Sequence, residues 1–547
     1  MIRRPSFSLL CGLLLAVPVS AFALDDSELA ALLGQRLQGD RTGACFAAAV
    51  VRPEGVARAV ACANAESPRA IDTDTAFEIG SVSKTLNGLL LQLLIEEGRV
   101  QLDDPVQAHL PEGVRMPQFG EAPITLRHLL THTSGLPSLA PSWRITSPAN
   151  PYRAIDIEAL HGGLASVQLT RAPGERFEYS NLGAMLLSEL ISRVSGQPFD
   201  ALARERVFAP LGMSAAHVGA APEGVRVAQG HAPSTQPVAH WDFDPALAGV
   251  GGVRASLNDM VAYLQAQLGL RGSPLTASIA VSHAPVHPES GAPMAMGWML
   301  APLNASQVLV HEGGTGGFSS FVAFTQDRSR GVVVLSDTAM TSLGGLGSVG
   351  LHLLDASVPL GSPRIALDPP AELLEALAGE YRLQAGLKMS LRRRGEALEI
   401  QAEGQPAFVM GYDSAGDFYP VAFDAVLRPR VEEGRASFVW LQGGGAQAAS
   451  RIEPAATAAT VDAQPLMDYV GTYPLMPGFA LRVFEEGGAL MAQATGQGAF
   501  ALVAAGENVF RADAFGIEIR FARDEAGRVK ALALHQGGQV LRGERGD

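Results

Sequence analysis

The sequence predicts an α/β fold in which an antiparallel sheet is flanked by helices and carries an all-helical subdomain, followed by two all-β, barrel-like modules. Two observations predict it. Apolar strand-like segments occur near both ends of residues 24–360, at about 43–63 and 297–335, with a mostly helical section at 100–260 between them. Beyond a proline-rich linker near 358–370, the chain changes to short alternating strands, which are typical of small barrels or sandwiches.

The N-terminal segment has the pattern of a secretory signal peptide. Arg3 and Arg4 precede an apolar run from Phe7 to Val19, and Ala21-Phe22-Ala23 forms a cleavage site. We therefore interpret residues 1–23 as a signal peptide and expect a bacterial protein that is exported, periplasmic or secreted. No later stretch offers some 18 uninterrupted apolar residues, so we expect no transmembrane segment.

The charge balance of the chain is acidic. Its 547 residues include 41 Lys and Arg against 55 Asp and Glu, and removal of Arg3 and Arg4 with the signal leaves 39 basic residues and a net charge of −16. Such a surface repels nucleic acid and anionic membranes. We expect a small-molecule or short-peptide substrate, no nucleic-acid partner and no cofactor, whereas the oligomeric state is not predicted.

The first strand pair contains two cysteines. Cys45 and Cys62 flank Arg52-Pro53-Glu54-Gly55, a turn with proline at its second position. Pairing about this turn places opposite each other those residues whose numbers sum to 107, and Cys45 and Cys62 satisfy this condition. We expect a disulfide in an exported protein. Two small buried hydrophobic side chains are the alternative interpretation.

The segment Phe77–Thr85 runs from a short strand-like stretch into a helical pattern that lasts to Gly98. Ser81 and Lys84 share one face of the first turn, where unpaired backbone N–H groups favour negative charge. Lys84 is the only lysine before Lys388 in a chain that otherwise uses arginine. A desolvated lysine can lose its proton and arginine cannot, so the pattern favours an activated serine. Taken alone, such a four-residue match also arises by chance.

The middle section contains Leu126-Arg-His-Leu-Leu-Thr-His-Thr-Ser-Gly-Leu-Pro137. Its two histidines, His128 and His132, are four residues apart, which is the spacing of a helical zinc pair. No glutamate sits between them in an H-E-x-x-H pattern, and no third ligand is evident. We interpret both as packing or local hydrogen-bonding residues and expect no metal.

Two later stretches also indicate a site. Pro173–Asn181 is a turn before the apolar helix Leu182–Val194, where Tyr179 and Asn181 can project into one cleft, although a lone tyrosine is more often a core aromatic. His311–Gly317 is glycine-rich at a strand edge, which permits close approach of a ligand to the backbone. It lacks the strand-to-helix pattern of a phosphate loop.

The C-terminal third contains a tandem repeat. Ala378–Leu383 recurs 92 residues later as Val470–Leu475, so residues 371–455 and 465–547 form two related modules joined by an Ala/Thr-rich linker near 455–464. Glycine, tyrosine and phenylalanine recur, which are residues of turns and cores. We expect the modules to pack against the catalytic domain and one loop to narrow its cleft. A spacer or a cell-wall-binding appendage is the alternative.

These motifs occur in a fixed order: F-E-I-G-S-V-S-K-T, L-R-H-L-L-T-H-T-S-G-L-P, P-G-E-R-F-E-Y-S-N-L-G and H-E-G-G-T-G-G-F. Over residues 30–355 the chain resembles class C β-lactamase-related serine hydrolases of the penicillin-recognising S-x-x-K superfamily. The resemblance implies that Ser81 forms an acyl-enzyme and that Lys84 or Tyr179 accepts its proton. Which of the two does so is left open.

The resemblance further implies an oxyanion hole made by the backbone N–H groups of Ser81 and Gly314, with Asn181 holding the substrate amide. The third family motif, K-T-G in β-lactamases, is His311-Glu312-Gly313 here, and Gly313 completes the substrate-binding set. A neutral imidazole attracts a carboxylate less than lysine does, and we expect lowering the pH toward 6 to charge His311. The H-x-G motif and the C-terminal modules resemble D-aminopeptidase-like and esterase-like members.

Three functions follow from this resemblance. The favoured one is a peptidase, amidase or esterase for small substrates such as D-amino-acid peptides, peptidoglycan-derived peptides or short-chain esters. A class C-like β-lactamase is the first alternative. An inactive relative that binds peptidoglycan fragments as a sensor is the second, and the complete set of Ser81, Lys84 and Tyr179 argues against it.

Overall fold

The computed structural model describes residues 24–546 except for residues 67–68, 148, 287–292, 385, 433–434, 443–444, 453–465, 477, 496–498, 513–514 and 537–538. The expected signal peptide at 1–23 and the expected linker at 455–464 lie outside the described residues. The chain divides into two compact units, Met1–Ser450 and Arg451–Asp547. Within the described part, no helix has both the length and the apolar character needed to cross a membrane.

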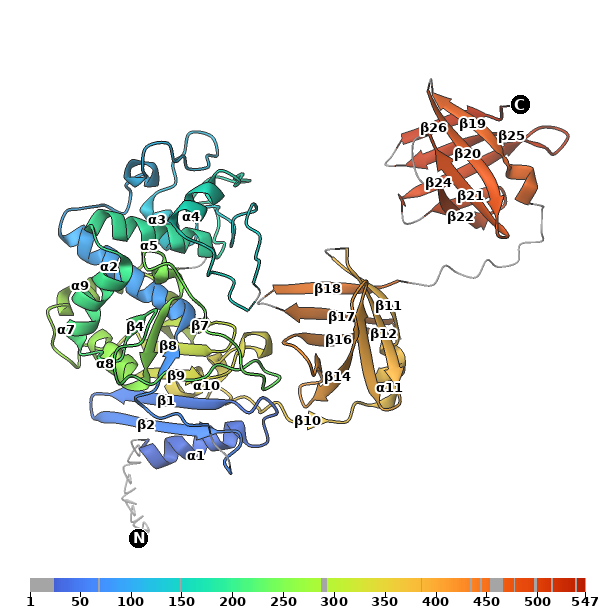
Figure 1. Ribbon diagram of the computed structural model, residues 1–547. Coiled ribbons are helices and arrows are strands. Elements are labelled where there is room, and N and C mark those ends of the chain that lie inside the picture. The colour runs from blue at the N-terminus through green and yellow to red at the C-terminus, as the bar shows by residue number, and fades with distance from the viewer. Residues whose placement is uncertain are drawn as a thin grey trace, which may run out of the picture. The chain divides into compact units, whose positions relative to one another are not determined.

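A six-stranded antiparallel sheet with strand order β2-β1-β9-β8-β7-β6 is the centre of the first unit (Figure 1). β1 pairs with β9, so strands from the two ends of the domain meet inside the sheet. The expected antiparallel sheet is confirmed. Its strands are β1 (Cys45–Arg52), β2 (Gly55–Cys62), β6 (Met299–Leu303), β7 (Ser306–Gly314), β8 (Ser319–Thr325) and β9 (Gly331–Ser336).

Helices cover both faces of this sheet. Alternate residues of β1 join two different cores, as the two-residue period of a strand requires. One core contains α2 (Ser83–Glu96) and α8 (Leu257–Gln267), and the other contains α1 (Asp26–Leu37) and α10 (Gly347–Leu354). Because both faces are covered, β9 is buried along its whole length.

The middle section has fewer helices than the sequence predicts. Residues 131–156 contain no helix among the described positions, because the prolines, the serines and Asn150 there favour turns over a continuous helix. The expectation of a mostly helical section at 100–260 is therefore wrong. Further helices among the described residues of this unit are η2 (Val106–His109), α3 (Leu126–Leu130), α4 (Ile157–Leu164), α5 (Asn181–Ser195), α6 (Phe199–Ala203), η3 (Arg204–Phe208), α7 (Ala209–Leu211), η4 (Ala248–Val250), α9 (Thr276–Ser282) and η6 (Thr341–Leu343).

A small second sheet brings the chain to the start of α2. It has the order β3-β5-β4 and consists of β3 (Ala76–Glu78), β5 (Val253–Ser256) and β4 (His217–Val218). The amide of Ile79 donates to the carbonyl of Val253 at 3.1 Å. This bond continues the β3–β5 pairing to the residue directly before η1 (Gly80–Val82).

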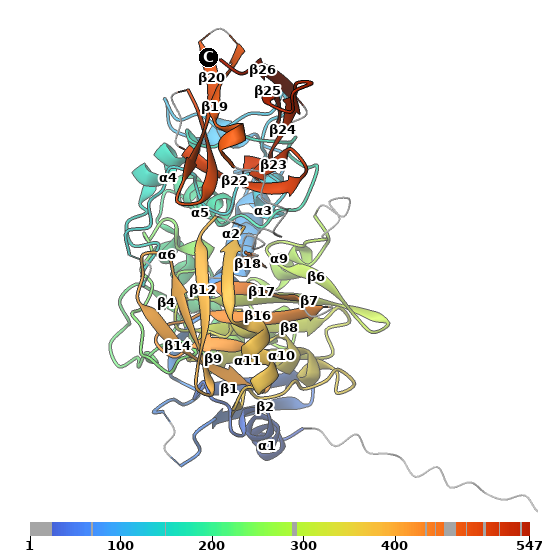
Figure 2. The same ribbon diagram turned by 90° about the vertical axis from the view of Figure 1, so that its right-hand side faces the viewer.

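The first β-module is a nine-stranded sheet whose order is β10-β14-β13-β12-β11-β18-β17-β16-β15, and an additional β14–β15 pairing closes it into a barrel (Figure 2). The helix α11 (Ala371–Leu377) contributes to its core. The strands are β10 (Ala366–Leu367), β11 (Gly379–Leu383), β12 (Lys388–Arg394), β13 (Ala397–Ala402), β14 (Ala407–Asp413), β15 (Phe418–Pro420), β16 (Val426–Glu432), β17 (Arg435–Gln442) and β18 (Gly445–Arg451).

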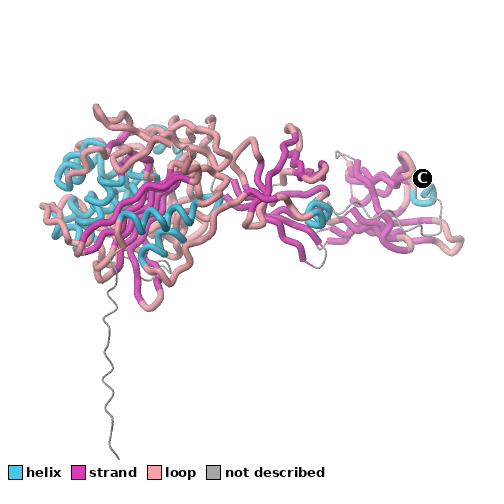
Figure 3. The backbone as a smooth tube through the Cα atoms, turned by 90° about the horizontal axis from the view of Figure 1, so that it is seen from below, coloured by secondary structure: helices cyan, strands magenta, loops and turns pink. Residues whose placement is uncertain are grey.

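The second module is an eight-stranded meander in sequence order, and strands dominate it as they do the first (Figure 3). The Gly546 amide donates to the Thr472 carbonyl, which brings the end of the last strand back beside the first. The elements are η7 (Leu466–Tyr469), β19 (Gly471–Met476), β20 (Phe479–Glu486), β21 (Ala489–Ala494), β22 (Ala499–Gly506), β23 (Val509–Ala512), β24 (Ile517–Arg523), β25 (Val529–Gln536) and β26 (Gln539–Glu544).

The two modules share a structural detail at the repeated tyrosine. The Tyr381 hydroxyl donates to the Leu377 carbonyl at 3.0 Å, and the Tyr473 hydroxyl donates to the Tyr469 carbonyl at 2.9 Å. Both tyrosines are fully buried. The repeat therefore preserves the same tie between the first strand and the turn before it, and the expected pair of barrel-like modules is confirmed.

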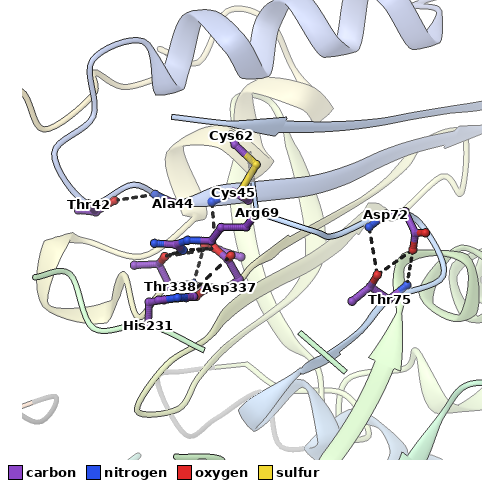
Figure 4. The surroundings of a disulfide bond; sticks show 11 residues. Thr42, Ala44, Cys45, Cys62, Arg69, Asp72, Thr75, His231, Asp337 and Thr338 are labelled. Atoms are coloured by element: carbon purple, nitrogen blue, oxygen red, sulfur yellow. Dashed lines mark hydrogen bonds and ion pairs between the residues drawn. A yellow bond between two sulfur atoms is a disulfide. The ribbon is translucent and has the colours of Figure 1, made fainter. Parts of the chain in front are cut away.

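The hairpin of β1 and β2 has the register that its turn predicts. Cys45 is paired directly with Cys62, and Arg52 with Gly55. The structure joins the two sulfur atoms in a disulfide, with Cα atoms 3.9 Å apart. Figure 4 shows its surroundings, where the buried Asp337 accepts from the Cys45 amide at 2.9 Å and from Arg69 Nη1 at 2.9 Å.

Buried ion pairs connect the first module to the sheet domain. Arg364 Nη1 lies 3.3 Å from Asp413 and 2.8 Å from Asp417, and Arg41 Nε donates to Asp413 at 3.0 Å. The Arg41 guanidinium also stacks over the Tyr419 ring at 3.4 Å. Both carboxylates are buried, and each has two arginine partners, since Asp417 also accepts from Arg428 at 2.9 Å. Removal of one arginine would therefore leave each buried charge only partly compensated.

Candidate active site

Ser81 lies in η1, the single turn that leads directly into α2. Gly80 has φ +49°, and a Cβ atom there would lie 2.7 Å from the Gly314 backbone nitrogen. Glycine at this position therefore allows η1 to lie directly against the end of β7. Ser81 is placed where the end of β7 meets the first turn of the buried helix α2.

The Lys84 ammonium group makes three contacts from inside the core. Its Nζ lies 2.9 Å from Ser81 Oγ, 3.0 Å from Asn181 Oδ1 and 2.7 Å from the Val250 carbonyl oxygen. Burial lowers the pKa of Lys84 to about 7. The amide oxygen and the carbonyl oxygen can only accept hydrogen bonds, so they take two N–H groups. In the neutral amine, the remaining direction carries a lone pair toward Ser81 Oγ.

Tyr179 lies near this group. Its ring centroid is 5.0 Å from Lys84 Nζ. Burial raises the pKa of Tyr179 to about 12, and a hydrogen bond with Ser81 opposes this shift. The phenol therefore keeps its proton at neutral pH. It can donate a hydrogen bond at the site but is a poor initial base.

Asn181 is the first residue of α5, and Ser180 caps that helix by accepting from the Gly183 amide. The Asn181 side chain joins Lys84 on one side, and its Nδ2 donates to the Tyr152 hydroxyl at 3.0 Å on the other. The cap thus fixes the point at which Asn181 leaves the loop. Both polar ends of the Asn181 side chain are engaged.

His311 is buried on β7 and is 1% exposed. Its Nδ1 lies 2.8 Å from the Glu312 carbonyl oxygen, which can only accept, so Nδ1 carries the proton and Nε2 does not. No hydrogen-bond partner of Nε2 is found among the described residues. Burial, and then the nearby Lys84, lower the pKa of His311 to about 4. The expectation that pH 6 would charge His311 is therefore wrong.

The two residues that end β7 lie against the serine segment. A Cβ atom at Gly313 would lie 2.0 Å from the Ile79 carbonyl oxygen, so only glycine permits this contact. Gly314 follows, with its nitrogen beside Gly80. The main-chain N–H groups of Ser81 and Gly314 therefore come from two segments in contact, which is the arrangement that an oxyanion hole needs.

Tyr152 is a site residue that the sequence did not indicate. It is 9% exposed, stacks on Phe243 at 4.8 Å and contacts Trp241 at 5.4 Å. Tyr152 lies in the irregular stretch before α4, where no motif or periodicity marks it. Tyr152 is recognised as part of the site through its hydrogen bond with Asn181, which depends on the tertiary fold.

Comparison with known families identifies the domain that holds this cluster. A family model described as Beta-lactamase matches residues 29–342, more than half of the chain. The chain belongs to the Beta-lactamase family. It is a serine hydrolase of the penicillin-recognising superfamily, as the resemblance implied. A second model, described as a domain of unknown function (DUF3471), matches residues 455–545.

Relatives of this Beta-lactamase family member are named for different activities. D-alanyl-D-alanine-carboxypeptidase/endopeptidase AmpH of Escherichia coli K12 is 27% identical over 285 residues, covering 48% of this chain and 71% of AmpH. Esterase EstB of Burkholderia gladioli is 34% identical over 224 residues, covering 37% of this chain and 55% of EstB. A beta-lactamase of Pseudomonas fluorescens is 28% identical over 312 residues, covering 50% of this chain and 83% of that beta-lactamase.

One solved structure extends the comparison of folds beyond the Beta-lactamase domain. The octameric penicillin-binding protein homologue from Pyrococcus abyssi matches with a TM-score of 0.51 and 19% identity. The match covers 85% of this chain and 97% of that chain. At this identity, it shows a shared fold.

The structure brings together most of the residues that the sequence singled out. Ser81, Lys84 and Asn181 are linked by hydrogen bonds, and Tyr179 and His311 lie beside Lys84. The disulfide lies at the far end of the β1–β2 hairpin and belongs to no part of this cluster.

The two histidines of the Leu126–Pro137 segment have separate surroundings. His128 Nδ1 accepts from the Thr125 amide at 3.1 Å and completes the cap of α3. His132 instead contacts Tyr179, with ring centroids 4.3 Å apart. Across the described residues, no three His, Cys, Asp or Glu side chains are grouped as metal ligands.

Proposed function

We propose that the protein is an exported serine hydrolase that cleaves amide or ester bonds of small substrates through an acyl-enzyme on Ser81. The single observation that carries this proposal is the 2.9 Å contact between Ser81 Oγ and a buried lysine whose pKa lies at about 7. A general base with a pKa near the working pH is the most effective partner for a serine nucleophile.

Lys84 is the base for acylation in this proposal. Neutral Lys84 takes the proton from Ser81 Oγ as that oxygen bonds to the substrate carbonyl carbon, and the carbonyl electrons move to its oxygen. At pH 7 roughly half of Lys84 is neutral, whereas only about one Tyr179 in 10⁵ is a phenolate, given pKa values of about 7 and about 12. The larger fraction of the proton-accepting form favours lysine as the base.

The remaining groups then have distinct roles. The backbone N–H groups of Ser81 and Gly314 hold the developing oxyanion, and Asn181 orients the substrate amide. The Tyr179 phenol gives a proton to the leaving group and regains one from the Lys84 ammonium. Attack of water on the acyl-enzyme releases the acid product and restores the Ser81 hydroxyl.

The proposed substrates lack a carboxylate at the position facing His311. The imidazole is neutral, and its Nε2 carries a lone pair, so it can accept a hydrogen bond but cannot pair with an anion. Short-chain esters, and D-amino-acid or peptidoglycan-derived peptides whose C-terminal carboxylate lies away from His311, fit this requirement, and the activity for which EstB is named is in the ester class. The carboxypeptidase activity for which AmpH is named acts on a residue that carries the C-terminal carboxylate, so AmpH supports the peptide class but not this requirement. Hydrolysis of β-lactam rings is the second candidate, supported by the beta-lactamase relative.

We also propose that the first β-module supports the wall of the site. A Cβ atom at Gly314 would lie 2.5 Å from Thr341 Oγ1, so η6 borders the proposed oxyanion hole. The next residue, Ser342, donates to Asp424 Oδ1 of the module at 3.2 Å. The module thus holds η6 in place, in keeping with a role in substrate selection.

A turnover panel tests the proposed function. It contains nitrocefin, short-chain p-nitrophenyl esters, and D- and L-alanine p-nitroanilides, each assayed with the wild type and with Ser81→Ala. Turnover of a neutral ester or amide that the Ser81→Ala change abolishes supports the proposal. Turnover of nitrocefin alone would assign the β-lactamase function, and no turnover of any substrate would favour a sensor.

A further inference from the structure

His132 holds an unusual backbone conformation next to the candidate catalytic tyrosine. It follows α3 with φ +54° and is 3% exposed. Residues other than glycine adopt such angles uncommonly, and they persist where surrounding contacts fix them. From the sequence, we interpreted His132 only as a packing or local hydrogen-bonding residue. The proposed mechanism assigns it no role.

Two hydrogen bonds connect His132 to the residues on either side of Tyr179. The Glu178 amide donates to the His132 carbonyl oxygen at 2.7 Å. The Ser180 amide donates to His132 Nδ1 at 3.1 Å. Main chain and side chain of one histidine therefore hold the backbone N–H groups of the two residues that flank the tyrosine.

The imidazole also contacts the tyrosine ring itself. The His132 and Tyr179 rings are stacked, with centroids 4.3 Å apart and planes inclined by 29°. Phe177 packs its ring edge-on against the imidazole at 5.9 Å. The stack limits rotation of the Tyr179 ring, while the two hydrogen bonds limit movement of its backbone.

The protonation state of His132 follows from its partner. The Ser180 amide can only donate, so Nδ1 carries a lone pair and the ring is neutral. The titratable groups facing it are Lys84, His311 and Tyr179. Burial, followed by the charges of Lys84 and His311, keeps the pKa of His132 well below its usual range. The hydrogen bond to Ser180 therefore persists at every pH at which Lys84 is neutral.

We propose that His132 is a positioning residue that aligns the Tyr179 hydroxyl for proton transfer by clamping residues 178 and 180 and stacking on the tyrosine ring. The inference rests on the proposed function, because it assigns Tyr179 the task of protonating the leaving group. Loss of the clamp should affect kcat more than KM and should matter most for leaving groups that need a proton.

Two variants separate the parts of the clamp. In His132→Asn, Oδ1 occupies the position of Nδ1 and asparagine tolerates the positive φ, so only the stack is lost. In His132→Phe, the ring remains and the acceptor is lost. His128→Asn is the matched control, because His128 also accepts a backbone N–H in the same segment, but from Thr125 at the start of α3. We expect the control to leave kcat within about twofold of the wild type.

The experiment measures kcat and KM for a p-nitrophenyl ester and for the matching ethyl ester, whose alkoxide needs a proton to leave. We expect His132→Asn to lower kcat for the ethyl ester about tenfold and His132→Phe roughly a hundredfold, with much smaller losses for the p-nitrophenyl ester. In a Tyr179→Phe background, either His132 substitution should lower kcat by less than about a further threefold, because His132 and Tyr179 act on the same proton transfer.

Three results overturn the inference. In the first, the losses of kcat from His132→Asn and Tyr179→Phe multiply in the double variant. In the second, His132→Asn lowers kcat equally for the two esters. In the third, the substitutions change only the melting temperature. His132→Asn keeps the test decisive if His132→Phe does not fold. A wild type that is never labelled by a fluorophosphonate would instead refute the proposed function, and the role of His132 with it, so the two failures are distinguishable.

Discussion

The pH dependence of acylation follows from the buried position of Lys84. With a pKa of about 7, roughly a tenth of Lys84 is neutral at pH 6 and roughly nine tenths at pH 8. Because only the neutral amine can accept the Ser81 proton, kcat/KM should rise about tenfold over this interval. The rise should fit a single ionisation.

Groups near Lys84 should add no second inflection to the pH profile of kcat/KM between pH 6 and 8. The pKa of His311 is lowered to about 4 and that of His132 lies well below its usual range, so both stay neutral above pH 6. The pKa of Tyr179 is raised to about 12, so the phenol stays protonated below pH 9. One inflection near pH 7 should therefore belong to Lys84.

The assay is the initial rate with a p-nitrophenyl ester at low substrate concentration, corrected for uncatalysed hydrolysis at each pH. Lys84→Arg is the matched variant, because it keeps the positive charge and cannot lose its proton. It should lose several orders of magnitude in kcat/KM and show no inflection near pH 7. A flat wild-type profile between pH 6 and 8, or a mild effect of Lys84→Arg, would refute the role of Lys84 as base.

Three further predictions follow. His311→Lys should raise kcat/KM for carboxylate-bearing β-lactams relative to neutral esters, since it restores a fixed cation; an unchanged ratio, measured by steady-state kinetics, would show that residue 311 does not face the substrate. Alkylation of unreduced periplasmic protein should leave Cys45 and Cys62 unmodified by mass spectrometry, and two alkylated cysteines would favour buried thiols. Asp424→Asn should change the ratio of kcat/KM between bulky and small esters by a few-fold through Ser342, and an unchanged ratio would limit the module to other roles.

The parts of the site that the sequence predicted are those that depend on local geometry. Ser81 and Lys84 lie three residues apart at a helix start, so their contact follows from helical spacing alone. The register of Cys45 and Cys62 likewise followed from one turn. In both cases, a short segment determines which side chains meet.

The parts that the sequence did not predict depend on contacts between distant segments. The Val250 carbonyl is a backbone group 166 residues from Lys84, and no residue type marks it. Tyr152 lies in an irregular stretch, where periodicity carries no information. His132 was noticed for its spacing from His128, but its contact with Tyr179 arises only when α3 and α5 pack together.

Electrostatic surroundings were also beyond the sequence. The neutral state of His311 was expected at pH 7, but complete burial lowers its pKa to about 4 and removes the expected response at pH 6. Burial is a property of the whole fold, whereas residue type sets only the starting pKa.

The central claim is an acyl-enzyme on Ser81, and intact-mass spectrometry after incubation with a fluorophosphonate probe tests it most directly. We predict one phosphonyl adduct per chain, mapped to the peptide that contains Ser81, and no adduct in Ser81→Ala, whose free energy of unfolding should stay within about 1 kcal/mol of the wild type. An adduct on another residue, or hydrolysis that persists in a folded Ser81→Ala protein, would contradict the claim.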